Sequence, residues 1–328
     1  MTGGKEDNGI LLEARGLKKY FPVRRGLWRR TAGYIKAGDG VSLRIERGKT
    51  LGVVGETGSG KSTLGRMLLR LLPADEGEVF FDGRDLLKMG GRELKSARRR
   101  MQIIFQDPYG SLNPRMRVGE IVSEGLVNFR VGTRREREAR TARLLERVGL
   151  PPEAAALYPH EFSGGQRQRI GIARALALNP AFILCDEPVS SLDVSIQAQI
   201  LNLLADLQEE FSLAYLIIAH DLSVVEHISD RVAVMYSGRI VEEASSRDLY
   251  REPAHPYTRA LLASIPVPDP DAPPPGAAAD REIAPEGEPA EGCRFYPRCP
   301  RRRDRCRERP PELAEVAPGH LAACFLAE

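Results

Sequence analysis

The segment Gly55-Glu-Thr-Gly-Ser-Gly-Lys-Ser62 constrains the fold of this chain more than any other, because it fits the pattern G-x-x-x-x-G-K-[ST]. That pattern places backbone N–H groups around phosphates, a lysine at the β/γ oxygens and a hydroxyl at Mg²⁺. The apolar run 50–54 before it predicts a buried strand, and 62–72 after it a helix whose N-terminus faces the anion. We expect this P-loop to contact ATP through Gly55, Gly58, Ser59, Gly60, Lys61, Ser62 and Thr63.

An acidic element follows about 120 residues after the P-loop. Phe182-Ile-Leu-Cys-Asp-Glu187 is an apolar strand pattern that ends in two carboxylates, so Asp186 should stand at the C-terminal edge of the sheet beside the P-loop. Asp186 can then hold Mg²⁺ together with Ser62, and Glu187 can orient or deprotonate the attacking water. The two motifs predict an α/β P-loop NTPase.

The segment Ser163-Gly-Gly-Gln166 is a glycine-rich cap on the apolar-periodic helix pattern 170–178. It is a second helix N-terminus suited to phosphate. The P-loop already binds the phosphates of one active site. The simplest interpretation is therefore that this signature segment completes the active site of a facing subunit. Two ATP would then lie between two protomers, each contacted by the partner through Ser163, Gly164, Gly165 and Gln166.

With these motifs, residues 10–265 resemble the ATP-binding-cassette (ABC) ATPases. The resemblance implies a Q-loop glutamine at Gln106, which contacts Mg²⁺ and the catalytic water, and a switch histidine at His220, which contacts the γ-phosphate. It also implies a D-loop at 191–193, in which Asp193 crosses the dimer interface, and an aromatic at Tyr20 that stacks on adenine. Phe21 is the alternative to Tyr20, because only one of two successive strand residues faces the base.

The organisation along the chain is an α/β core with a small antiparallel β subdomain at 11–49 and a helical signature subdomain at about 107–165. The arginine-rich runs at 98–100 and 134–140 are typical of a solvated helix face. A hairpin pattern follows at 231–241. The helical spacing of Ile196, Ile200, Leu203 and Leu207 predicts core positions.

Composition limits the partners. The net charge of +3 gives no electrostatic signature of nucleic-acid binding. The apolar runs fall far short of the roughly 20 residues that a spanning helix needs, and the polar N-terminus has no signal-peptide core. We therefore expect a cytosolic chain whose membrane role depends on partners.

Two further strings, 106–115 and His255-Pro-Tyr-Thr258, resemble segments of the ATPase subunits of oligopeptide and dipeptide importers. The resemblance implies an ATP-hydrolysing subunit that powers peptide import from the cytoplasmic face of the inner membrane. Its implied partners are two transmembrane permease subunits, a second and related ABC ATPase, and an extracytoplasmic peptide-binding protein in the same complex. A nickel or other small-solute importer of this family, and a non-transport ABC ATPase, remain as alternatives.

The composition changes after Ser264. Residues 266–292 hold eight of the 24 prolines and predict a stiff tether, and 293–328 form a small Cys-rich C-terminal extension. Clustered cysteines in a cytosolic chain favour a metal over disulfides, and gaps of five, six and seventeen residues suit zinc poorly. The tail resembles the Cys-bearing extension of peptide-importer ATPases, some of which hold a [4Fe-4S] cluster. We expect that cluster here, with free reduced thiols as the alternative, on Cys293, Cys299, Cys306 and Cys324.

Overall fold

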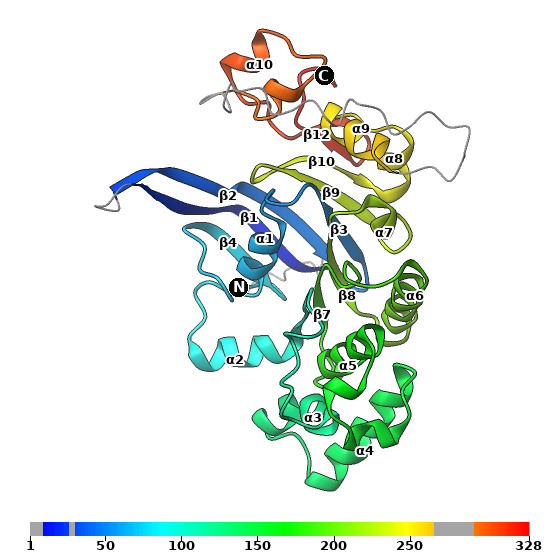
Figure 1. Cartoon of the computed structure of the whole chain (residues 1–328). Helices are drawn as coiled ribbons and strands as arrows, with labels where there is room; N and C mark the ends of the chain where they lie inside the picture. Colours follow the sequence, from blue (N-terminus) through cyan, green and yellow to red (C-terminus); the bar gives the residue numbers. More distant parts are fainter. Residues whose placement is uncertain (1–8, 26–29, 266–291, 328) are drawn as a thin grey trace, which may run out of the picture. The chain divides into compact units, whose positions relative to one another are not determined.

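The computed structural model describes residues 9–25, 30–265 and 292–327 (Figure 1). The chain forms two compact units. The first combines the described part of 1–13 with 44–50 and 79–218, and the second combines 14–43, 51–78 and the described part of 219–328. Apart from Gly292, the predicted tether lies outside the described residues.

Three parallel strands form the centre of the first unit. They are β6 (Met101–Ile104), β7 (Phe182–Asp186) and β8 (Ala214–Ala219), with β7 paired to both of the others. Every residue of β7 and β8 is buried, as their continuous apolar runs predict. The strand predictions for 182–186 and 215–219 are therefore confirmed.

The first unit also contains helices, some of which lie within the predicted helical insert at about 107–165. They are α2 (Gly91–Arg100), α3 (Val118–Asn128), α4 (Arg134–Arg147), α5 (Gly164–Leu176) and α6 (Val194–Phe211), with short 3₁₀ turns η1 (Pro152–Ala156) and η2 (Pro159–Glu161). Thr133 and Glu136 begin α4 with a reciprocal capping box, and the last turns of this helix bury Leu144 and Leu145. The arginines at 98–100 are exposed, as a solvated face requires.

The prediction for α6 is correct only in part. Ile200 and Leu207 are buried, but Leu203 is half-buried and Leu204 occupies the core position instead. Residues three and four positions along a helix share a face, so spacing alone could not choose between the two leucines. Ile196 is also half-buried, and its contact with Gly165 is described with the signature segment below.

In the second unit, β3 (Thr50–Val54) runs parallel to β9 (Arg231–Tyr236), and β9 forms an antiparallel hairpin with β10 (Arg239–Ser245). Helix α1 (Lys61–Leu68) follows the P-loop and is shorter than predicted, because the chain turns into the left-handed region at Arg70. The helices α7 (Leu222–Glu226), α8 (Ser246–Arg251) and α9 (Pro256–Ala263) also belong to this unit, and α10 is described with the extension below.

A second sheet contains β1 (Ile10–Arg25), β2 (Arg30–Glu46), β4 (Glu76–Phe81) and β5 (Arg84–Asp85), in the order β2-β1-β4-β5. It is the small antiparallel sheet that the sequence predicts, although β1 and β2 are longer than most strands. No helix in the described parts of the chain is long and apolar enough to cross a bilayer.

The C-terminal extension, residues 293–327, contains η3 (Tyr296–Arg298), α10 (Arg305–Glu308), β11 (Ala314–Ala317) and β12 (His320–Ala322). Strand β12 pairs antiparallel with β10, so the extension continues the sheet of the second unit. Glu242 of β10 is fully buried and accepts hydrogen bonds from the backbone N–H groups of Ala254 and His255 and from His320 Nε2 at 2.7 Å. The extension is thus joined to the sheet by strand pairing and by hydrogen bonds to Glu242.

His255 makes the stability of this region depend on pH. Its Nδ1 accepts a hydrogen bond from the Tyr257 N–H, which requires that nitrogen to be unprotonated, and burial lowers the pKa of His255 from 6.5 to about 4. The unfolded chain therefore binds a proton first, so stability is fully present above pH 6.5 and declines as the pH falls toward 4. We predict that His255→Asn, which keeps an acceptor without the titration, flattens the decline between pH 7 and 5 in urea unfolding. Equal declines in both proteins would contradict this.

Candidate nucleotide-binding and catalytic site

The shape of the P-loop is fixed by close packing of its glycines. Gly55, Gly58 and Gly60 all have positive φ, where residues with a Cβ are strained. A Cβ on Gly55 would lie 2.1 Å from the Met235 carbonyl oxygen, and one on Gly60 would lie 2.0 Å from that of Ala37. The loop is thus pressed against backbone on its outer side.

Lys61 closes the inner side of the loop. The side chain is 4% exposed, and its Nζ donates to the carbonyl oxygens of Gly55 at 2.6 Å and Glu56 at 2.9 Å. Helix α1 begins at this residue, with Ser62 and Thr63 half-buried in its first turn. A lysine and a helix N-terminus together suit an anion such as a triphosphate.

Tyr20, the predicted adenine contact, belongs to a polar network around Asp39. The hydroxyl of Tyr20 donates to Asp39, which also accepts from Arg239 at 2.8 Å and from Arg294 of the extension. Burial would raise the pKa of Asp39, but the hydrogen bonds from Tyr20 and Arg239 and the charge of Arg294 together lower it to about 2. Burial and the bond to Asp39 raise the pKa of Tyr20 to about 12. The alternative, Phe21, is 37% exposed.

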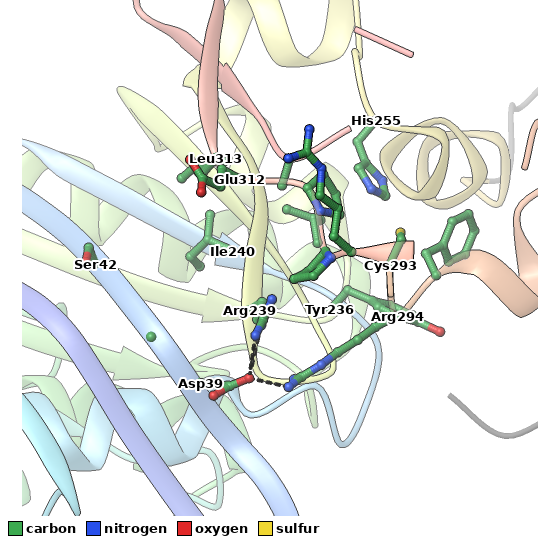
Figure 2. A pocket seen from close by; sticks show the side chains of 17 residues that line it. Asp39, Ser42, Tyr236, Arg239, Ile240, His255, Cys293, Arg294, Glu312 and Leu313 are labelled. Atoms are coloured by element: carbon green, nitrogen blue, oxygen red, sulfur yellow. Dashed lines mark hydrogen bonds and ion pairs between the residues drawn. The ribbon is translucent and has the colours of Figure 1, made fainter. Parts of the chain in front are cut away.

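A cavity of about 620 Å³ opens beside this network, between the sheet and the extension (Figure 2). Asp39 stands at its edge, and Figure 2 shows the ion pairs of that carboxylate with Arg239 and Arg294. Its lining includes His255 and Cys293 but no residue of the P-loop. The cavity is therefore a feature of the extension and its neighbours.

The first unit carries a separate group of predicted catalytic residues. Gln106 Nε2 donates to Glu187 Oε2 at 2.8 Å, although 81 residues separate the two. Glu187 directly follows β7 and has a left-handed backbone with φ of 48°, while its N–H bonds to the Ile218 carbonyl of β8. Asp186 is 3% exposed at the last position of β7. A strained conformation held by both neighbouring strands is typical of a functional carboxylate.

The signature segment begins α5 with a reciprocal cap. Ser163 Oγ accepts from the Gln166 N–H at 3.3 Å, and Gln166 Oε1 accepts from the Ser163 N–H at 2.9 Å. The glycines between them are needed for packing. A Cβ on Gly165 would lie 2.6 Å from Ile196 Cγ2, and one on Gly164 would lie 3.3 Å from Leu192. The predicted D-loop and the start of α6 thus lie directly against the signature segment.

Two arginines that sequence reasoning did not assign attach the Q-loop segment, residues 106–115, to α5. Arg174 donates to the Ser111 carbonyl at 2.6 Å, and the Arg167 guanidinium lies 3.9 Å from the centre of the Tyr109 ring. Burial lowers the pKa of Arg174. The two arginines are seven residues apart and therefore lie on one face of α5. That spacing could have predicted from the sequence that both contact the same neighbouring segment.

The remaining predicted residues are exposed. Asp193 stands at the N-cap position of α6 without a side-chain cap bond, and His220 follows β8. His220 belongs to the second unit with the P-loop and Tyr20, whereas Asp193 belongs to the first unit with Gln106, Glu187 and the signature segment.

The prediction of a [4Fe-4S] cluster is not supported. Among the described residues, which include all four cysteines of the tail, no group of three or more His, Cys, Asp or Glu could hold a metal ion. Burial, reinforced by the neighbouring thiols, raises the pKa of Cys293 to about 11, and burial also raises those of Cys299 and Cys324. Cys185 is fully buried in β7, as packing alone predicts.

The geometry agrees with comparisons to known proteins. Residues 39–190 match the family described as ABC transporter, and residues 241–306 match the family described as oligopeptide/dipeptide transporter, C-terminal region. The chain is 51% identical to the oligopeptide transport ATP-binding protein AppF of Bacillus subtilis and 46% identical to the dipeptide transport ATP-binding protein DppF of Haemophilus influenzae, with 99% of each chain covered in both cases. A putative peptide import ATP-binding protein of Brucella ovis is 54% identical over 96% of this chain and 97% of its own.

Solved structures give the same fold. CbiO1 of Clostridium perfringens, part of an ABC transporter complex, has a TM-score of 0.65 and 27% identity over 75% of this chain and 92% of its own. The ATP-binding cassette MJ0796, solved as a dimer bound to ADP and Pi, has a TM-score of 0.64 and 30% identity over 72% of this chain and 99% of its own. The chain belongs to the ABC transporter ATP-binding proteins, in the oligopeptide/dipeptide branch, and is an ABC-type ATPase.

The contact between the signature segment and α6 predicts an unusual response to Gly→Ala substitution. Within a helix such a change normally stabilises by up to about 1 kcal/mol. At Gly165 we predict a loss of about 1–2 kcal/mol instead, because the new methyl meets the stiff β-branched Ile196. Gly171→Ala is the control, since its Cβ would meet nothing within 4 Å in the same helix. Denaturant unfolding measures both, and the loss at Gly165 should disappear in an Ile196→Ala background. A stabilising Gly165→Ala would refute the contact.

Proposed function

We propose that this chain hydrolyses ATP to power the import of peptides through a membrane complex. One observation favours peptide as the substrate over nickel or another small solute. Residues 241–306 match the C-terminal region of oligopeptide/dipeptide transporters, and the whole chain is similar to proteins named for peptide transport.

The nucleotide roles follow from the placement of each group. Lys61, the N-terminus of α1 and the P-loop N–H groups hold the phosphates, with Gly55, Gly58, Ser59, Gly60, Ser62 and Thr63 forming the loop and first turn. Tyr20 contacts adenine. Ser62 and the buried Asp186 are oxygen donors of the kind that Mg²⁺ prefers, with Gln106 as a further oxygen ligand. Bound Mg²⁺ neutralises charge on the phosphate oxygens.

Glu187 is proposed as the base that orients the attacking water. The hydrogen bond from Gln106 holds one carboxylate oxygen of Glu187 at 2.8 Å, and a carboxylate held in this way is suited to orient a water molecule. His220 is proposed to contact the γ-phosphate. Arg167 and Arg174 attach the Q-loop segment to α5. A change in the position of Gln106 can therefore be transmitted to α5, the helix of the signature segment, through direct contacts.

We propose that two ATPase subunits close on two ATP, with Ser163, Gly164, Gly165, Gln166 and Asp193 acting at the partner's nucleotide. The second subunit is a related chain, and two permease subunits and an extracytoplasmic peptide-binding protein complete the complex. This chain would then be a peripheral protein at the cytoplasmic face of the inner membrane. We also propose the division into an ATPase domain at 10–265, a tether at 266–292 and an extension at 293–328.

Isolation of the intact assembly tests the proposal. The tagged full-length chain is purified from detergent-solubilised membranes, and its partners are identified by mass spectrometry. We expect two permeases, a second ABC ATPase and no nucleic acid. Recovery of the chain with a nickel-type complex, or without any membrane protein, would overturn the peptide assignment.

We predict that Glu187→Gln abolishes turnover and leaves ATP binding intact, because the amide keeps the shape but loses the charge that orients water. Loss of a positioned base typically lowers the rate about 10²–10⁴-fold. Hydrolysis by the assembled complex and equilibrium binding of a fluorescent ATP analogue measure the two effects. Glu209→Gln on the exposed face of α6 is the control and should hydrolyse normally. A Glu187→Gln complex that keeps most of its activity would remove Glu187 from this role.

We predict that Ser163→Arg blocks hydrolysis in the complex without weakening ATP binding by the isolated chain. The bulky side chain displaces the γ-phosphate of the facing subunit, while the P-loop of the same chain is untouched. Binding of the fluorescent analogue to the monomer, compared with turnover by the complex, separates the two outcomes. Loss of nucleotide affinity in the monomer would show that the signature segment does not act across a dimer.

A further inference from the structure

The C-terminal extension reaches the P-loop through one arginine. Arg298, the last residue of η3, makes two parallel hydrogen bonds to the carboxylate of Glu56: Nη1 to Oε2 at 2.8 Å and Nη2 to Oε1 at 2.8 Å. Such bidentate pairs are the strongest and most directional of charged hydrogen bonds. Glu56 raises the pKa of Arg298, so the guanidinium stays charged. Glu56 is the second residue of the P-loop.

The backbone of Glu56 is held by the same part of the unit. Its N–H donates to the Tyr257 hydroxyl at 2.9 Å. Tyr257 is fully buried, and its ring lies 5.4 Å from that of Phe295, which is three residues before Arg298. Cys293 and Arg294, which come directly before Phe295, line the cavity shown in Figure 2. Arg298 of the extension thus holds the side chain of Glu56 directly. Phe295 of the extension packs against Tyr257, which binds the Glu56 N–H.

Charge makes this contact important for nucleotide binding. An unpaired carboxylate at the second position of the P-loop would repel a triphosphate, which carries several negative charges. It could also compete for Lys61, whose Nζ already bonds to the Glu56 carbonyl at 2.9 Å. A paired Glu56 is neutralised and held aside from the loop interior.

We propose that Arg298 is a positioning residue for ATP, through which the C-terminal extension sets the affinity of the P-loop by neutralising Glu56. The proposal rests on the ATP-binding function of the P-loop. It gives the extension a role in the nucleotide site that needs no metal, and it makes the affinity for ATP dependent on whether the extension is in place.

Equilibrium binding of MANT-ATP with Mg²⁺ to the full-length chain tests the proposal. We expect Arg298→Ala to weaken binding roughly tenfold, the scale of the interaction between two unit charges about 12 Å apart at an effective dielectric of about 20. The double variant Arg298→Ala/Glu56→Gln should recover affinity to within about twofold of the wild type, because the repelling charge is gone. Arg298→Lys should fall between Arg298→Ala and the wild type. The defect of Arg298→Ala should shrink as salt is raised.

Arg302→Ala is the matched control. It removes the same charge from the same extension, but Arg302 contacts the Pro297 carbonyl and the Tyr296 ring, both within the extension. It should bind MANT-ATP as the wild type does. Thermal unfolding of each variant identifies any that fails to fold, and Glu56→Gln alone should then bind at least as tightly as the wild type.

The outcomes distinguish a failure of the proposed ATP-binding function from a failure of the proposed role of Arg298. A wild-type chain that does not bind MANT-ATP would refute the proposed function itself. A wild type that binds, with Arg298→Ala binding equally well, would overturn only this inference. A defect that persists in the double variant would show that Arg298 acts by anchoring the extension and not through the charge of Glu56.

Discussion

The P-loop depends on close contact between its glycines and neighbouring backbone. The carbonyl oxygens of Met235 and Ala37 occupy the space that a Cβ on Gly55 or Gly60 would need, at 2.1 and 2.0 Å. The loop therefore takes its shape from the strands outside it, and Lys61 then closes its inner side. Because the hairpin β9–β10 supplies one of these carbonyls and also pairs with β12, the phosphate loop and the C-terminal extension are built on the same sheet.

A comparable arrangement joins the catalytic residues of the first unit. Glu187 is strained and lies at the end of β7, with its side chain held by Gln106 and its N–H by β8. The Q-loop segment that begins at Gln106 is attached to α5, whose signature segment packs against α6. Residues of separate motifs therefore share direct contacts, and coupling between distant sites can be carried by packed and hydrogen-bonded networks of this kind.

Local patterns predicted most of this architecture. The buried strands 182–186 and 215–219 are uninterrupted apolar runs, and the glycine and lysine spacing of the P-loop has one structural meaning. Helical spacing could not choose Leu204 over Leu203, since both lie near the same face. The pairing of Arg298 with Glu56 spans 242 residues and leaves no local signal. The cysteine spacing favoured a cluster, but among the described residues no group of three or more possible ligands could hold a metal ion, and the extension is joined to the sheet by β12 and Glu242.

The central claim is that ATP hydrolysis by this chain drives peptide import. Its most direct test is uptake of a labelled peptide by proteoliposomes that hold the purified complex, with the binding protein outside and ATP on the side of this chain. The account predicts that uptake requires ATP and that peptide with its binding protein stimulates hydrolysis in the same vesicles. Hydrolysis that is indifferent to peptide, or uptake that proceeds without ATP, would contradict it.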